Sequence, residues 1–167
     1  MSVNKHRPHL FILPEDRANS QLANGFWLEA GSIRGMLVLP EAGGWKEVLG
    51  RFKSDHLAGM SKYPDRLMIL LIDFDGRDDR LNEAKHAIPD SLRERVFILG
   101  VWTEPEDLKA DLGSYETIGR AIARDCRDGT ITTWEHKLLL HNEIELNRLR
   151  DPVCRILFPP AEEGGDL

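Results

Sequence analysis

Four short apolar segments alternate with longer segments of helical periodicity, and this alternation restricts the fold more than any other feature. Each apolar segment is nearly continuous, as is typical of parallel strands that helices cover on both faces. We therefore expect a single α/β domain with a four-stranded, mostly parallel sheet, helices on both faces and a helical C-terminal extension. The expected strands are residues 9–14, 35–42, 67–74 and 95–102.

The segments between and after these strands carry apolar residues three and four positions apart, which is the spacing of amphipathic helices. Asp16 is the expected N-cap of the first helix. Thr132 and Glu135 have the spacing of a capping box at the start of the last helix, and Pro152 is expected to close it. Helical structure is expected within residues 15–30, 44–60, 77–95, 105–129 and 132–152.

The composition agrees with one globular domain. The chain has 167 residues, of which 41% are hydrophobic and 30% charged, so a sizeable core can form. No apolar run approaches the ~20 residues that span a bilayer, and the N-terminal residues lack the apolar core of a secretion signal. We expect a cytoplasmic protein with no membrane partner, made of a domain over residues 1–158 and a flexible acidic tail over 159–167.

Cysteine and histidine give no sign of a metal site of their own. Cys126 and Cys154 have no CxxC partner, and we expect two reduced, partly buried thiols. His136 and His141 are five positions apart, so they are expected on different helix faces as surface or interface residues. The absence of a His or Cys cluster weighs against zinc.

Carboxylates follow all four expected strands. The run Leu67–Ile72 ends on Asp73-Phe74-Asp75, and the other strands are followed by Glu15-Asp16, Glu41, and Glu104 with Glu106. In a parallel sheet these acids converge on one edge, where ligands of such sheets bind. Crowded carboxylates need either protonation or a cation, and oxygen ligands suit Mg²⁺ or Mn²⁺.

The order of these motifs resembles the Toprim domain of topoisomerases, primases and overcoming-lysogenization-defect nucleases. The resemblance covers about two-thirds of the chain and rests on Glu15 in FILPEDRAN and on Asp73 and Asp75 in LIDFDG. It implies a Rossmann-like fold, a Mg²⁺ (or Mn²⁺) site and nuclease-like phosphoryl transfer on nucleic acid.

Carried over to this chain, the resemblance makes Glu15 a general acid/base or metal ligand. Asp73 and Asp75 would hold the metal, and Glu104 is a weaker match to a further acid. Asp16 stands where the family usually has glycine.

Two other functions fit parts of the pattern. A receiver-like phosphoacceptor domain would use Glu15-Asp16, Asp73 and Thr103, but it needs a lysine on a fifth strand, which is not found. A catalytically inactive interaction module would use the expected helix over 132–150, whose broad apolar surface suggests a protein partner or a homo-oligomer.

The formal net charge of −6 argues against a broad nucleic-acid-coating surface. A local basic face remains, and it would be the nucleic-acid contact if there is one. Its expected residues are Lys46, Arg51, Lys53, Lys62 and Arg66.

Overall fold

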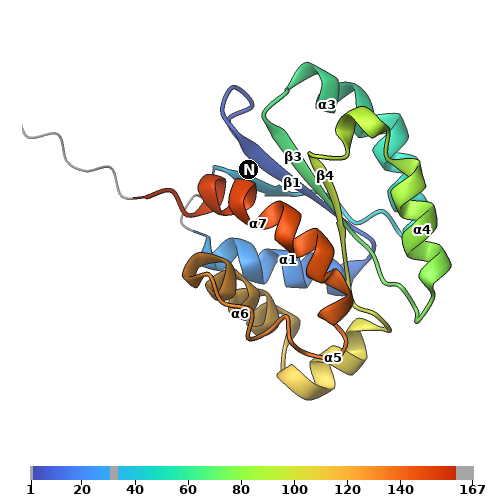
Figure 1. Ribbon diagram of the computed structural model, residues 1–167, viewed down its shortest axis with the longest axis vertical. Coiled ribbons are helices and arrows are strands. Elements are labelled where there is room, and N and C mark those ends of the chain that lie inside the picture. The colour runs from blue at the N-terminus through green and yellow to red at the C-terminus, as the bar shows by residue number, and fades with distance from the viewer. Residues whose placement is uncertain (1, 31–33, 161–167) are drawn as a thin grey trace, which may run out of the picture.

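The computed structural model describes residues 2–30 and 34–160 and forms an α/β domain around one parallel sheet (Figure 1). The strand order is β2-β1-β3-β4, and every neighbouring pair is parallel. This confirms the expected fold class. The strands are β1 (His9–Pro14), β2 (Met36–Val38), β3 (Arg66–Leu71) and β4 (Val96–Leu99).

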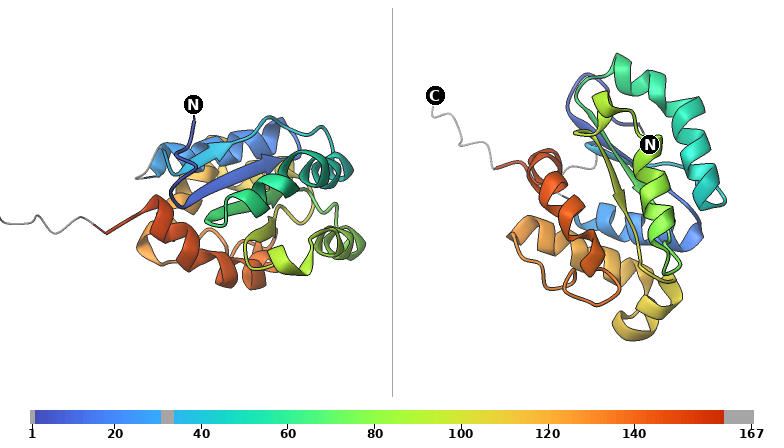
Figure 2. Two further views of the ribbon diagram at one scale, coloured as in Figure 1. Left: turned by 90° about the horizontal axis from the view of Figure 1, so that it is seen from above. Right: turned by 45° about the vertical axis from the view of Figure 1, so that its right-hand side comes forward.

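Helices cover both faces of the sheet. On one face lie α2, the π-helical turn η1, α3 and α4, and on the other lie α1 and α7, with α6 packed against α1. Figure 2 shows α4 and α7 on opposite sides of the strands. The helices are α1 (Arg17–Glu29), α2 (Trp45–Arg51), η1 (Phe52–His56), α3 (Leu57–Lys62), α4 (Asp78–Ala87), α5 (Pro105–Leu112), α6 (Tyr115–Asp128) and α7 (Glu143–Leu157), with short 3-10 turns at Asp90–Leu92 and Leu140–Asn142.

The strand sequences explain these two layers. Alternate side chains of a strand point to opposite faces, so both sets must be apolar when both faces are covered. Leu13 and Leu70 belong to the core under α2, α3 and α4. Ile12 and Ile69, one residue away, belong to the core under α1 and α7.

The central pair of strands decides where the ends of the sheet meet. β1 and β3 pair over their full length, from His9 opposite Arg66 to Pro14 opposite Leu71. From β1 the chain moves outward to β2, and from β3 it moves outward the other way to β4. The crevice at such a change of direction is where open α/β sheets bind ligands.

Two glycines allow α1 and α6 to pack very closely. A Cβ added at Gly119 would lie 2.1 Å from the backbone oxygen of Leu22, and one at Gly25 would lie 2.3 Å from that of Glu116. Neither backbone atom can move without separating the helices. This contact therefore fixes the position of α6 over α1.

The C-terminal half differs from the sequence-based expectation. Residues 105–129 form two helices, and Thr132 and Glu135 do not start a helix. Asp125 is the physical reason: its buried carboxylate accepts bonds from the Thr130 hydroxyl at 2.5 Å and the Thr133 backbone N–H at 2.7 Å. These bonds hold the chain after α6 in turns.

The last helix starts later and runs further than expected. α7 begins at Glu143, and Pro152 lies inside it. Pro152 does not close the helix because the neighbouring α7 residues Leu149 and Val153 are buried against the sheet, where packing outweighs the local preference.

Three expectations for individual side chains are wrong. Cys126 of α6 and Cys154 of α7 are disulfide-bonded, with their Cα atoms 6.3 Å apart, because the two helices bring them together. Arg66 is 4% exposed and does not join a basic face; its Nε donates to His9 Nε2 at 2.9 Å. The ring nitrogens of His141 are buried, since the ring packs between Phe74 and Trp102.

Side chains from the C-terminal region close the outer edge of β4. Glu145 of α7 accepts a hydrogen bond from the Ile98 backbone N–H at 2.9 Å. Asn142 bonds both backbone groups of Gly100, accepting at 3.1 Å and donating at 2.9 Å. Both side chains are buried, so the edge is shielded from solvent at these positions.

The helices of the described part of the chain are too short or too polar to cross a membrane. Most of the expected acidic tail, residues 161–167, lies outside the described residues.

The close approach of α1 and α6 gives a test of the fold. Gly119→Ala should lower the free energy of unfolding by about 1–3 kcal/mol, because the new methyl group forces the two backbones apart. Gly50→Ala in α2 is the matched control: nothing lies within 4 Å of its added Cβ, so stability should rise by about 0.5–1 kcal/mol. Urea unfolding of both variants measures the difference, and equal effects would contradict the packing.

Candidate active site at the carboxyl end of β1 and β3

Glu15 and Asp73 meet at the carboxyl edge of the sheet. The pairing of β1 with β3 continues beyond the strands, since the Glu15 backbone N–H donates to Leu71 at 2.9 Å. The Glu15 side chain then folds across to β3, where Oε2 accepts a hydrogen bond from the Asp73 backbone N–H at 2.7 Å. The two acids that are 58 positions apart in sequence are thus held in direct contact.

Asn19 joins a third carboxylate to this pair. Asp16 is the N-cap of α1 and accepts from the Asn19 backbone N–H at 2.9 Å. The Asn19 side-chain Nδ2 donates to Asp16 Oδ1 and to Asp73 Oδ1, both at 3.0 Å. One fully buried amide group therefore orients two carboxylates from different elements.

This environment disfavours a charge on Asp73. The pKa of Asp73 is raised from 3.8 to about 7: burial is the largest cause, the Asn19 hydrogen bond opposes it, and the charges of Glu15, Asp16 and Glu106 add to it. At neutral pH this carboxyl group therefore exchanges a proton readily.

Glu15 is shifted in the same direction. Burial raises the pKa of Glu15, and the charge of Asp16 adds to this, while hydrogen bonds from the Asp73 and Trp45 backbones and the charge of Arg80 lower it. Arg80 of α4 reaches the site through its Nη1, which donates to the Asp73 backbone oxygen at 2.9 Å.

Two expected site residues lie apart from this pair. Asp75 has a positive φ of 53°, its side chain is 53% exposed, and its Oδ2 is 3.4 Å from Arg80 Nη2. Glu104 is exposed and is the N-cap residue of α5, without a side-chain capping bond. The structure thus unites Glu15 with Asp73 and leaves Asp75 and Glu104 nearer the surface.

Sequence reasoning did not single out Asn19, Glu106 or Tyr115 as site residues. Burial and the charges of Glu106, Asp16 and Asp73 raise the pKa of Tyr115, so its phenol stays protonated beside the acids. Asn19 could have been found, because it lies one helical turn after Asp16 on the same face. The sequence gives no comparable signal for Tyr115, which the close packing of α6 on α1 brings there.

The donor atoms suit a hard divalent cation. Glu15, Asp16 and Asp73 offer carboxylate oxygens, the ligands that Mg²⁺ and Mn²⁺ prefer. Among residues 2–30 and 34–160, no three acids, histidines or cysteines are already arranged as a metal-binding group. Binding would therefore require the carboxylates to turn from their present hydrogen bonds.

Comparisons of the chain with protein-family models, with curated proteins and with solved structures find no match. Function must therefore be argued from the site itself.

The raised pKa of Asp73 predicts a pH-dependent stability. The folded state binds this proton more tightly than the unfolded state, so Asp73 lowers stability as the pH rises from about 4 through 7. Asp73→Asn keeps the shape and removes the charge. The difference in the free energy of unfolding, Asp73→Asn minus the natural protein, should be about 1–2 kcal/mol larger at pH 8 than at pH 4. The variant thus gains stability relative to the natural protein as the pH rises.

The control is Asp151→Asn, which changes an exposed carboxylate of α7. Its effect on stability should be nearly independent of pH. If the stability difference between Asp73→Asn and the natural protein also did not change with pH, the pKa of Asp73 would not be raised in the folded protein. Titration of the Asp73 carboxyl ¹³C resonance reads the same pKa directly.

Proposed function

We propose that this chain is a Toprim-like domain that carries out Mg²⁺-dependent, nuclease-like phosphoryl transfer on nucleic acid. The observation that supports it most is the contact between Glu15 and Asp73 at the switch point between β1 and β3. Ligands of open parallel sheets bind at this place, and carboxyl groups with perturbed pKa values cluster at functional sites.

The chemistry of the donor set fits the proposed cation. Glu15 and Asp73 would hold it, with Asp16 close enough to contribute because Asn19 ties it to Asp73. Bound Mg²⁺ supplies positive charge that neutralises phosphate oxygens. Asp75 and Glu104 remain proposed outer ligands, which would have to turn inward to take part.

The protein's own groups can handle the proton that phosphoryl transfer requires. Burial raises the pKa of Glu15 above its usual value, which makes its carboxyl group a better proton acceptor and suits it to act as a general acid/base. Arg80 is positioned by Asp73 and Asp75, and its guanidinium can meet a phosphate at the rim of the site.

Asp16 explains how the site works without the glycine found in the family at this position. A carboxylate at the N-cap starts α1 and also fixes Asn19, which in turn fixes Asp73. A glycine would leave the Asn19 amide with one carboxylate partner. In this chain Asp16 therefore gives Asn19 and Asp73 a defined orientation, where a glycine would leave the backbone more flexible.

A nucleic-acid partner would reach the molecule through the remaining basic face on α2, η1 and α3. Lys46, Lys53 and Lys62 are exposed there, and Arg51 donates to the Glu41 backbone oxygen at 3.2 Å. Only the end of this face that carries Lys46 adjoins the site, because Arg80 stacks 5.2 Å from the ring of Trp45, the first residue of α2. Lys62 lies at the end of α3, next to the opposite end of β3.

The receiver-like function is the second candidate. The strand order agrees with the first four strands of the 2-1-3-4-5 order of such domains. However, such a domain needs a lysine at the end of a fifth strand, and the sheet of the described residues has four strands. Labelling of Asp73 by acetyl phosphate would favour this candidate over the first.

Metal binding should release protons. Because the pKa of Asp73 is about 7, this carboxyl group carries a proton in more than half of the molecules at pH 6.5. A cation that binds the carboxylate must displace that proton. We expect Mn²⁺ titrations in buffers of different ionisation enthalpy to show this release by calorimetry. Asp73→Asn should lose the release and weaken binding at least tenfold, whereas Asp151→Asn should retain both.

Nuclease activity is the second test. The purified protein with Mn²⁺ should nick plasmid or degrade single-stranded DNA, and Glu15→Gln should reduce the rate at least a hundredfold. Asp151→Asn should cut at the natural rate. Metal binding without cleavage of DNA or RNA would refute the nuclease and leave an inactive interaction module.

A further inference from the structure

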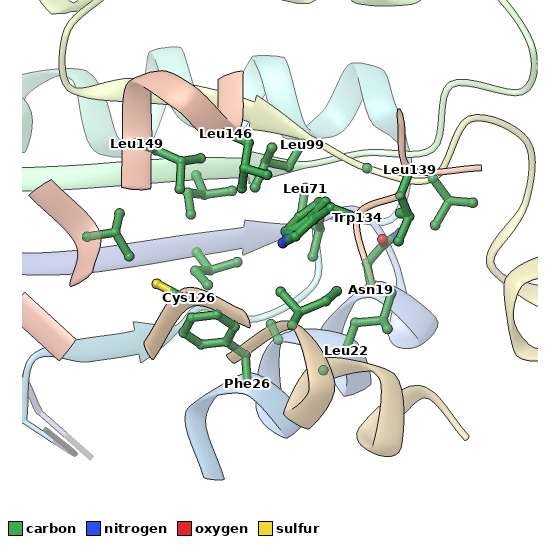
Figure 3. A pocket seen from close by; sticks show the side chains of 18 of the residues that line it. Asn19, Leu22, Phe26, Leu71, Leu99, Cys126, Trp134, Leu139, Leu146 and Leu149 are labelled. Carbon is green, nitrogen blue, oxygen red and sulfur yellow. The ribbon is translucent and has the colours of Figure 1, made fainter. Parts of the chain in front are cut away.

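An apolar cavity that is partly open to solvent lies behind the acid site, between the sheet and helices α1, α6 and α7. Its volume is about 90 Å³, and its wall is almost entirely carbon. Figure 3 shows Trp134 and Leu139, from the turns after α6, on the side of Asn19, and Leu146 and Leu149 of α7 on another side. The carboxylates of Asp16 and Asp73 do not line the cavity. Asn19 lies between the cavity and these carboxylates, to which its Nδ2 donates.

Asn19 places an unpaired polar atom in this wall. Its side chain is completely buried and lines the cavity, and no group of residues 2–30 and 34–160 donates a hydrogen bond to its Oδ1. The amide cannot simply be reversed, because its Nδ2 already donates to Asp16 and Asp73 and an oxygen there would face two carboxylate oxygens. The hydrogen bonds to Asp16 and Asp73 therefore hold Oδ1 in a position where no group of the described residues donates to it.

Such an atom normally has a partner, since a buried acceptor without one is costly. Water is a poor candidate, because a buried water needs two to four polar partners and this wall is nearly all apolar. A molecule with a carbon body and a single donor would satisfy both the wall and the Oδ1 atom. A cavity of about 150 Å³ holds benzene, so a ligand here must be smaller than benzene.

We propose that this cavity is a binding site for a small apolar molecule, about the size of a five-membered ring, whose single N–H or O–H donates to Asn19 Oδ1. Binding here requires neither a metal ion nor catalysis, but a metal ion that turned Asp16 and Asp73 away from Asn19 would also release its amide. Binding depends only on the cavity and on the direction in which Asp16 and Asp73 hold the Asn19 amide.

Pyrrole and furan test the proposal as a matched pair. The two rings have nearly the same size, but pyrrole carries an N–H donor and furan does not. In ¹H–¹⁵N NMR titrations of the full chain, pyrrole should shift the side-chain resonances of Asn19 and Trp134. Its dissociation constant should be at least tenfold lower than that of furan.

Cavity-filling variants locate the binding. Ala23→Val and Ile122→Phe each add carbon to the cavity wall and should weaken pyrrole binding at least tenfold. Ala84→Val makes the same type of change in the core on the other face of the sheet and should leave pyrrole binding unchanged. The dispersed NMR spectrum shows in each case whether the variant is folded.

Three results would overturn the inference. The first is that pyrrole at millimolar concentrations leaves the Asn19 and Trp134 resonances unshifted. The second is that furan binds as tightly as pyrrole, and the third is that both filled but folded variants bind pyrrole like the natural protein. None of these results bears on Mn²⁺ binding or DNA cleavage, so failure here is distinguishable from failure of the proposed function.

Discussion

The parallel pairing of β1 with β3 is the constraint on which the site depends. The register that sets Pro14 opposite Leu71 carries Glu15 to the backbone of Asp73, and it does so before any side-chain interaction is considered. A shift by one residue would exchange the two apolar faces of the strand, which both cores forbid. The cores therefore position the carboxylates, and hydrogen bonds from the Asp73 backbone and from Asn19 complete the arrangement.

Much of the fold could be predicted because its signals are local. The apolar runs that contain Ile12 and Ile69, the Asp16 cap and the end of helical structure at residue 129 each depend on a few neighbouring residues, and the structure confirms them. The prediction failed where a distant contact decides the conformation. Thr132 and Glu135 have the pattern of a capping box, yet the buried Asp125 carboxylate binds this stretch in turns.

In the candidate site, too, one part could be predicted from the sequence and another part could not. The meeting of Glu15 and Asp73 follows from strand order and could be predicted, since parallel strands end at one edge. Asn19 could have been found from its spacing to Asp16, whereas the role of Tyr115 could not, because it depends on the glycine contact that brings α6 against α1. Asp73 and Asp75 were expected to hold the metal together. The chain instead turns at Asp75, whose positive φ directs it toward Arg80.

The hydrogen bonds that close the outer edge of β4 affect how this molecule can associate with others. An exposed strand is a template on which another polypeptide can add a strand, and this is a common route to uncontrolled aggregation. Here Glu145 and Asn142 occupy the main-chain groups of Ile98 and Gly100 that an incoming strand would need. A second molecule cannot continue the sheet past these residues, so any association on this side has to use helix surfaces such as the one that exposes Ile144.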